Sequence, residues 1–169
     1  MFDSLLKHLC DQIELLESRT IKLGQKTLDL ERYNRSFNLR FYGFEERGTN
    51  DNIEKRVSEF LTKNLEIKIH HPVIENCHRA GVKRVGKPRP IIVRFHSRPF
   101  RQLILTSLTK LKGQKLGITV LEDLTKQMLN LYYKTRDGLD DTEKHKVVTR
   151  QGRVYIRNAD KSLTLVKDH

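Results

Sequence analysis

The chain has 169 residues, of which 37% are hydrophobic and 32% are charged, and its formal net charge at pH 7 is +12. No apolar run approaches the roughly 18 residues that a transmembrane helix needs, and the acids near the N-terminus argue against a signal peptide. The two cysteines, Cys10 and Cys77, are far apart in unlike contexts, which favours reduced intracellular thiols over a disulfide framework.

Residues 1–33 predict a coiled coil. From Phe2 to Leu30, apolar or threonine side chains recur at alternating spacings of four and three residues, and such a strict heptad period favours self-association over packing on the same chain. The seam consists of Leu6, Ile13, Thr20 and Thr27 at a, and Leu9, Leu16, Leu23 and Leu30 at d. The threonines and Gly24 weaken it, and these residues fit two strands or three. An amphipathic helix docked on its own domain is the alternative.

Residues 36–123 alternate between strands and helices. Strands are predicted over 38–44, 72–79, 90–95 and 116–123, and helices over 50–65 and 97–111. Ser97 suits the N-cap of the second helix and Pro99 its first turn. The order strand, helix, strand, strand, helix, strand is that of the split βαβ, or ferredoxin-like, arrangement. We therefore expect a sheet with one face left uncovered by helices.

Residues 124–169 predict a smaller C-terminal domain. A helix over 124–137, with Thr125 as its cap, precedes three short strands joined by the hairpin turns "QG" and "NADK". A helix on a three-stranded antiparallel meander has too small a core to stand alone, so we expect it to lean on its neighbour. The fold class expected for the whole chain is α+β.

The positive charge is concentrated in one stretch. From Asn76 to Leu121 there are 11 Lys and Arg residues and no acid. A solvated surface normally interleaves the two signs because like charges repel. Such a stretch indicates a polyanionic partner, most often nucleic acid, with an anionic membrane as the less favoured target.

The two central strands of the predicted sheet carry an unusual polar face. Alternation is expected to bury Leu39, Phe41, Ile91, Val93 and Phe95 and to expose Arg40, Tyr42, Ile92 and Arg94. On an open sheet of this kind, Tyr42 could stack on a base, and the two arginines could pair with phosphates. The alternative is a face covered by another element, with Tyr42 simply packed. The positions where the RNA-recognition consensus has stacking aromatics hold Arg40, Pro90 and Ile92, so we expect weak stacking, mostly electrostatic affinity and tolerance of sequence.

The loop over 78–90 is expected to be an extended basic arm, because two glycines and two prolines interrupt it. It could wrap a phosphate backbone; a mobile, solvated loop is the alternative. The strands of the C-terminal hairpin should bring further arginines to one face by alternation. The candidate nucleic-acid-binding residues are Arg40, Tyr42, Arg79, Lys83, Arg84, Lys87, Arg89, Arg94, Arg98, Arg101, Arg150, Arg153, Tyr155 and Arg157.

No enzyme signature is present in the sequence. The stretch "GVKRVGKP" matches G-x-x-x-x-G-K but ends in Pro88 and precedes a strand, so it lacks the hydroxyl and the helix of a P-loop. Cys77 and His78, with His70 and His71, lack the paired spacings of a zinc site. We expect no catalytic activity, no metal and no cofactor.

The combined motifs resemble a known family. A heptad-repeat N-terminus, "RSFNLRFYGF", "IENCHRAG", "RPIIVRF", "LEDLTK" and "VVTRQGRVYIRN" are together similar to the first-open-reading-frame protein of LINE-type (non-LTR) retrotransposons. The resemblance implies an oligomeric, usually trimeric, nucleic-acid chaperone that coats element RNA in a cytoplasmic ribonucleoprotein, with the nucleus as a second location. It also implies an RNA-recognition motif and a C-terminal domain that clamp a single strand of RNA, and of DNA as a second ligand, with no membrane partner.

Two features depart from that family pattern. Gly24 stands where the acid of an Arg-to-Glu trimer-specifying pair would be, so a dimer stays open beside the trimer that the resemblance favours. The C-terminal region ends at His169 without a long closing helix, which a truncated chain or a shorter lineage would explain. Two other function classes compete with the chaperone: a coiled-coil scaffold that binds proteins through Tyr42, Ile92 and the meander, and a cellular RNA-binding regulator with sequence preference.

Overall fold

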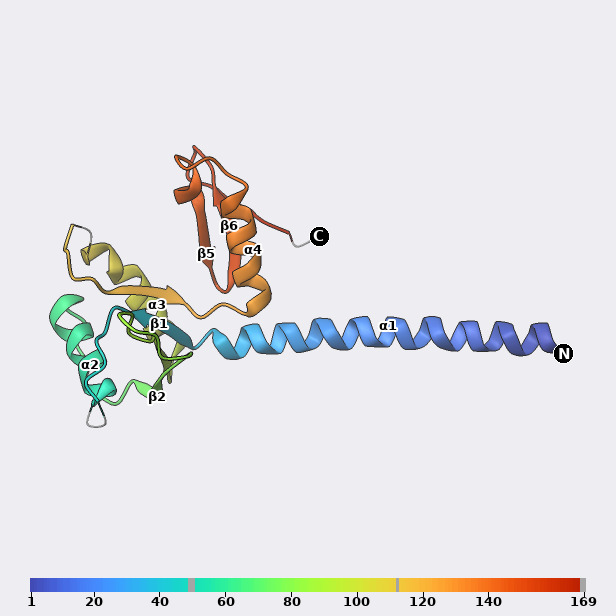
Figure 1. The fold of residues 1–169 in the computed structure, drawn as a ribbon, viewed down its shortest axis with the longest axis horizontal. Helices are drawn as coiled ribbons and strands as arrows, with labels where there is room; N and C mark the ends of the chain where they lie inside the picture. Colours follow the sequence, from blue (N-terminus) through green and yellow to red (C-terminus); the bar gives the residue numbers. More distant parts are fainter. Residues whose placement is uncertain (49–50, 112, 168–169) are drawn as a thin grey trace. The chain divides into compact units, whose positions relative to one another are not determined.

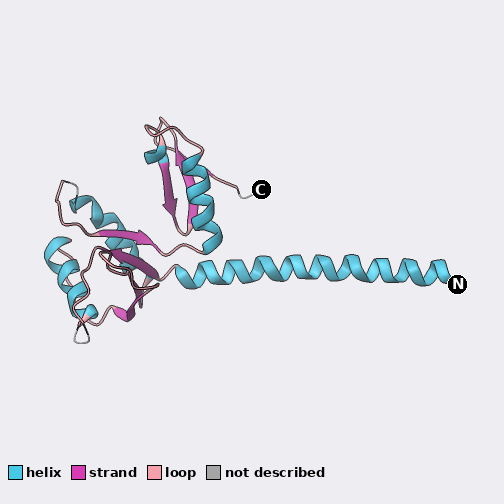
Figure 2. Cartoon of the chain, in the orientation of Figure 1, coloured by secondary structure: helices cyan, strands magenta, loops and turns pink. Residues whose placement is uncertain are grey.

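The structure is a computed structural model that describes residues 1–48, 51–111 and 113–167. The chain divides into two compact units, Met1–Asn34 and Arg35–His169. Figures 1 and 2 show one uninterrupted N-terminal helix, α1, and a second unit that contains both helices and strands. The α+β class is confirmed. Within the described ranges, no helix is long and apolar enough to cross a membrane.

Helix α1 (Phe2–Arg35) has 34 residues and buries none of them within its own chain. Its two seam threonines bond to the preceding turn: Thr20 Oγ1 donates to the Leu16 carbonyl at 2.9 Å, and Thr27 Oγ1 donates to the Leu23 carbonyl at 3.0 Å. This bonding satisfies their hydroxyls without any partner chain. The predicted helix is confirmed, and its pairing with other copies stays a prediction.

The second unit begins with a four-stranded antiparallel sheet in the order β2-β3-β1-β4. The strands are β1 (Asn38–Tyr42), β2 (Ile74–Arg79), β3 (Ile91–Phe95) and β4 (Thr119–Glu122). The helices are α2 (Ile53–Asn64) and α3 (Arg98–Ser107), and α3 continues into the 3₁₀ turn η1 (Leu108–Leu111). All six predicted elements are therefore present, each somewhat shorter than its predicted range. The two central strands are β1 and β3, as predicted.

Side-chain caps fix where the helices begin. Ser97 Oγ accepts a hydrogen bond from the Phe100 amide at 3.4 Å, and a proline occupies the first turn of α3, as predicted. Helix α2 begins after Asn52, whose side chain accepts from the Lys55 amide at 2.9 Å. Each cap satisfies one amide that has no partner inside its helix.

The core lies between this sheet and its two helices. The five inward-facing residues of β1 and β3 are completely buried, as the alternation predicted. They pack with side chains of α2 and α3 in one apolar cluster. Within it, Phe60 of α2 makes edge-to-face contacts with Phe41 and Phe44, with ring centroids 6.2 and 5.8 Å apart. The opposite sheet face, with Arg40, Tyr42, Ile92 and Arg94, is only half-buried.

A helix and a meander follow the sheet. Helix α4 (Lys126–Asp137), capped by Thr125 as predicted, packs on the antiparallel strands β5 (Val147–Arg150), β6 (Arg153–Arg157) and β7 (Leu163–Leu165). The 3₁₀ turn η2 (Lys144–Lys146) leads into β5. Leu131, Val147 and Val154 form a second, smaller core. Gln151 and Gly152 both have positive φ, as a type I′ hairpin turn requires.

Candidate nucleic-acid interface

The open sheet face is less basic than its sequence indicated. Arg40 stands at its centre, with Ile92 of β3 and Leu121 of β4 as its cross-strand neighbours. Arg40 Nε donates to Asp123 Oδ1 at 2.6 Å, and this carboxylate also accepts from Arg35 and Asn38. Burial would lower the pKa of Arg40, but the hydrogen bond to Asp123 and the negative charge of that carboxylate, with a smaller contribution from Tyr42, outweigh burial and raise it. Part of the Arg40 charge is therefore offset inside the protein.

Two further candidate arginines lie beside an aromatic ring. The guanidinium carbons of Arg94 and Arg98 lie 5.0 and 5.4 Å from the centroid of the Phe37 ring, within the range of cation–π attraction. Arg94 Nε also donates to Glu75 of β2 at 2.9 Å. These contacts hold both side chains in place at the start of β1.

Arg101 does not lie on the open face. It projects from α3 into the buried side of the sheet, where its side chain is 6% exposed and Nη2 donates to Glu122 Oε1 at 2.8 Å. Its Nε donates to the Asn38 carbonyl at 3.0 Å. The sequence predicted that Arg101 faces a nucleic-acid ligand, but the structure buries its side chain. The reason is helix phase, because Arg101 shares a helix face with Ile104 and Leu108, one and two turns further on. Its role here is an internal ion pair.

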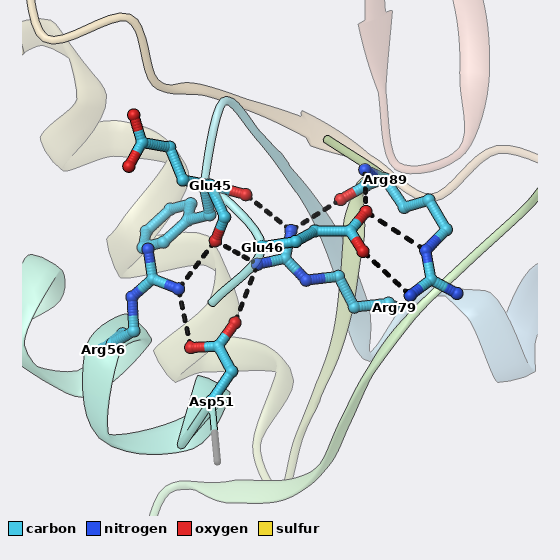
Figure 3. Close-up of polar contacts among 7 residues, drawn as sticks. Glu45, Glu46, Asp51, Arg56, Arg79 and Arg89 are labelled. Atoms are coloured by element: carbon cyan, nitrogen blue, oxygen red, sulfur yellow. Dashed lines mark hydrogen bonds and ion pairs between the residues drawn. The ribbon is translucent and has the colours of Figure 1, made fainter. Parts of the chain in front are cut away.

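Arg79 is locked at the root of the basic arm (Figure 3). Its guanidinium donates to the carbonyls of Phe44, Glu45 and Arg89 at 2.5–2.8 Å and to the Asp51 carboxylate at 3.1 Å. Asp51 also accepts from Arg56 at 2.7 Å. Burial would raise the pKa of Asp51, but the two arginines outweigh that effect and lower it. Arg79 thus ties the segment after β1 to both ends of the arm.

A second ion pair, between Arg89 and Glu46, fixes the other end of the arm. The guanidinium of Arg89 donates through two nitrogens to the two oxygens of Glu46, at 3.2 and 3.0 Å, and the Arg89 amide also donates to Glu46 at 2.9 Å (Figure 3). These hydrogen bonds lower the pKa of Glu46 to about 2. Fork-to-fork pairing of this kind fixes geometry as well as charge. Two of the predicted phosphate ligands, Arg79 and Arg89, are therefore engaged within the protein.

The tip of the arm carries free cations. Lys83, Arg84 and Lys87 are exposed, and no described residue forms an ion pair with any of them. A short bridge between residues 84 and 87 turns the chain, and the Ala80 amide donates to the Pro90 carbonyl at 2.9 Å where the arm closes. The arm therefore presents three uncompensated charges on a fixed base.

The meander gathers its arginines on one face, as predicted. Arg150 and Arg153 are cross-strand partners, and Tyr155 lies between Val148 and Leu165. Arg153, Tyr155 and Arg157 alternate with core-facing residues along β6. In the described part of the chain these three arginines have no ion-pair partner.

Sequence reasoning missed a cavity of about 270 Å³ between the sheet face and the C-terminal elements. Its walls include Tyr42 and Leu121 from the sheet, and Leu129, Tyr132 and Tyr133 from α4. The tyrosine pair in a predicted amphipathic helix was the available signal, because tyrosines three and four residues from a leucine share a face with it. We name this space the tyrosine cavity.

No protein-family model matches the chain, and no curated protein matches it significantly. In the part of the chain that the structure describes, no group of three or more His, Cys, Asp and Glu side chains is arranged to hold a metal ion. The positions of the chain's own charged and aromatic side chains therefore carry the functional inference.

Proposed function

We propose that this chain is a self-associating, sequence-tolerant protein that binds single-stranded RNA or DNA and acts as a nucleic-acid chaperone in the ribonucleoprotein of a LINE-type retrotransposon. The observation that carries the binding proposal is the arm tip, where Lys83, Arg84 and Lys87 are exposed and have no ion-pair partner among the described residues, while the arginines at the root of the arm are paired with carboxylates. The strand order β2-β3-β1-β4 supports a split βαβ domain of the RNA-recognition type. Such a particle would reside in the cytoplasm, with the nucleus as a second location.

The chemistry available to these side chains is phosphate neutralisation. A cation that contacts a phosphate releases a condensed counterion, so affinity falls as salt rises, whatever the base sequence. The arm tip and the meander arginines offer six such cations on flexible side chains. Sequence-tolerant neutralisation also lowers the repulsion between two strands, which is the physical requirement for promoting annealing and exchange.

Helix α1 supports self-association. Its apolar seam is exposed along the whole helix, and in the heptad frame the e positions carry Asp3, Glu17 and Glu31 while the g positions include Arg19 and Lys26. In a parallel coiled coil, g meets e of the next heptad on the partner, which pairs Lys26 with Glu31. An antiparallel pair would instead place like charges together. We therefore propose that a second copy of the chain, in parallel orientation, covers the apolar seam of α1.

Sedimentation equilibrium tests the self-association. Leu16→Asp should convert the oligomer to monomer, because it buries a charge in the seam. Leu15→Asp, one residue away and outside the seam, is the matched control and should leave the mass unchanged. Gly24→Ala should strengthen the oligomer, since a Cβ at this position meets no atom within 4 Å and alanine gains about 1 kcal/mol of helix propensity. A wild-type chain that sediments as a monomer would remove this part of the proposal.

Fluorescence anisotropy of a labelled single strand, repeated over a salt series, tests the binding. The triple variant Lys83→Ala/Arg84→Ala/Lys87→Ala should lower the slope of log K against log salt by about 2, because each lost phosphate contact removes about 0.7 for single strands. The matched control is Lys55→Ala/Lys63→Ala/Lys68→Ala, which removes three exposed lysines elsewhere in the same unit. Equal slopes for the two triples would contradict the assignment.

A second candidate function is a coiled-coil scaffold that binds proteins through the sheet face. The observation that favours it is the pairing of Arg40 with Asp123 and of Arg94 with Glu75, beside the apolar Ile92 and Leu121. A face of that composition suits a polar and apolar protein surface as well as a phosphate chain. Salt-independent anisotropy in the experiment above would favour this candidate over the first.

A further inference from the structure

The tyrosine cavity has walls that suit a flat, uncharged ring better than a phosphate. Leu121, Leu129 and Val147 line it together with three tyrosines, and its one arginine, Arg40, is already paired with Asp123. At about 270 Å³ it lies just below the range of roughly 300–1,000 Å³ that drug-sized ligands occupy. A single planar ring system matches both its size and its polarity.

The two tyrosines of α4 are held so that one ring stays available. Tyr132 packs against the small C-terminal core. The Tyr133 ring meets it edge to face, with centroids 5.4 Å apart and planes at 75°. Tyr133 itself is 51% exposed. An edge-to-face pair leaves a ring face open for a third aromatic partner, which is the geometry that base stacking uses.

Cations flank this ring along the same helix. Lys126, Leu129, Tyr133 and Arg136 follow one another at spacings of three, four and three residues, so they share one face of α4. Strand β5 also lines the cavity with Val147–Thr149 and then ends in Arg150, across from Arg153. A strand with one base in the cavity would therefore find positive charge for its phosphates along α4 and at the end of β5.

We propose that the tyrosine cavity receives one nucleobase of the bound single strand, stacked on Tyr133. This inference rests on the proposed nucleic-acid binding and adds the site at which the base is held. It moves the stacking surface from the sheet, where the sequence placed only Tyr42, to helix α4. Stacking on a ring face accepts every base, so the site adds affinity without adding sequence preference.

The experiment uses the full chain and a single strand with one 2-aminopurine, whose fluorescence is quenched when it stacks. Tyr133→Ala should weaken binding about 5- to 150-fold, the range for losing one stacked base, and should abolish the quenching. The salt slope should not change, because no phosphate contact is lost. Tyr133→Phe, which keeps the ring, should bind and quench as the wild type does. The matched control is Leu103→Ala, which removes an exposed large apolar side chain from a different helix, α3.

The outcomes separate the two proposals. If Tyr133→Ala binds and quenches like the wild type, the cavity holds no base, while salt-dependent binding of the wild type would still support the proposed function. If the wild type binds no single strand at any salt concentration, both proposals are overturned. If Leu103→Ala weakens binding as much as Tyr133→Ala, the loss reflects general damage to the fold and the base site is overturned.

Discussion

The two sheets of the second unit hold their arginines in opposite ways. Around the four-stranded sheet, Arg40, Arg94 and Arg101 each form an ion pair with a carboxylate. On the meander, none of Arg150, Arg153 and Arg157 does so among the described residues. The four-stranded sheet has the larger positive excess in its sequence, but each of its arginines therefore offers less uncompensated charge than an arginine of the meander.

This difference shows that a charge count along the chain does not locate an interface. The long acid-free stretch from Asn76 to Leu121 is neutralised in part by carboxylates that lie outside it, among them Glu46, Asp51 and Glu122. A paired arginine that binds a phosphate must first give up its carboxylate, so its contribution to affinity is the difference between two similar contacts. Unpaired arginines contribute their full counterion release.

The sharpest contrast should appear in stability. Arg101→Ala should lower the free energy of unfolding by about 3–5 kcal/mol, because it leaves Glu122 buried without its partner. Arg157→Ala removes an exposed arginine that has no ion-pair partner in the described ranges, and it should change the free energy of unfolding by less than about 0.5 kcal/mol. Urea denaturation followed by circular dichroism measures both. Equal losses of unfolding free energy in the two variants would mean that paired and unpaired arginines contribute equally to stability.

For nucleic-acid binding we expect the reverse order, with larger losses from removing the unpaired arginines than from removing the paired ones. The triple variant Arg150→Ala/Arg153→Ala/Arg157→Ala should lower the salt slope of single-strand binding by about 2, and should weaken binding roughly 100-fold at 0.1 M salt. The double variant Arg40→Ala/Arg94→Ala should lower the slope by less than about 1, even though two cations are lost. A double variant that weakens binding as much as the triple would make the sheet face the principal site.

Removing the carboxylate partner of a paired arginine should make that arginine behave like an unpaired one in nucleic-acid binding. Asp123→Asn keeps the side-chain shape and removes the charge that offsets Arg35 and Arg40. We expect the salt slope to steepen by about 0.7, the value for one additional phosphate contact. Glu59→Gln changes the net charge equally at an exposed position on α2 and serves as the control. A slope that stays constant in Asp123→Asn would mean that the strand does not reach Arg40.

The smallest effect concerns pH. Because the pKa of Glu46 is lowered from 4.5 to about 2 in the folded chain, its pairing with Arg89 stabilises the fold above pH 4.5. That contribution should fade as the pH drops from about 4.5 to about 2. A carbon-detected NMR titration should place the Glu46 midpoint near 2 in the wild type and closer to 4.5 in Arg89→Ala. A midpoint unaffected by Arg89→Ala would refute this pairing in solution.

Local patterns predicted the elements and their faces. Alternation placed Leu39 and Phe41 in the core, and short polar signals placed the caps at Ser97 and Thr125. These outcomes depend on residues a few positions apart, because a strand repeats every two residues and a cap spans three. Helix phase could also have placed Arg101 on the buried face of α3, beside Ile104.

The partners of the charged side chains could not be predicted in the same way. Arg40 and Asp123 are 83 residues apart, and Arg79 and Asp51 are 28 apart. Such pairs depend on which strands become neighbours and on the rotamers of long side chains, and neither leaves a periodic mark in the sequence. The tyrosine cavity is of the same kind, because Tyr42 and Tyr133 come from separate elements that meet only in the folded chain.

The closed root of the arm also bears on the entropy of association. Fixing the backbone of one residue costs about 1–2 kcal/mol, and a free loop of this length would lose that freedom along its whole course when it met a ligand. Here Arg79 and Arg89 hold both ends of the arm before any encounter. Only the few residues around Lys83 and Lys87 remain to be ordered, so more of the attraction between the arm and an anionic chain is kept as affinity.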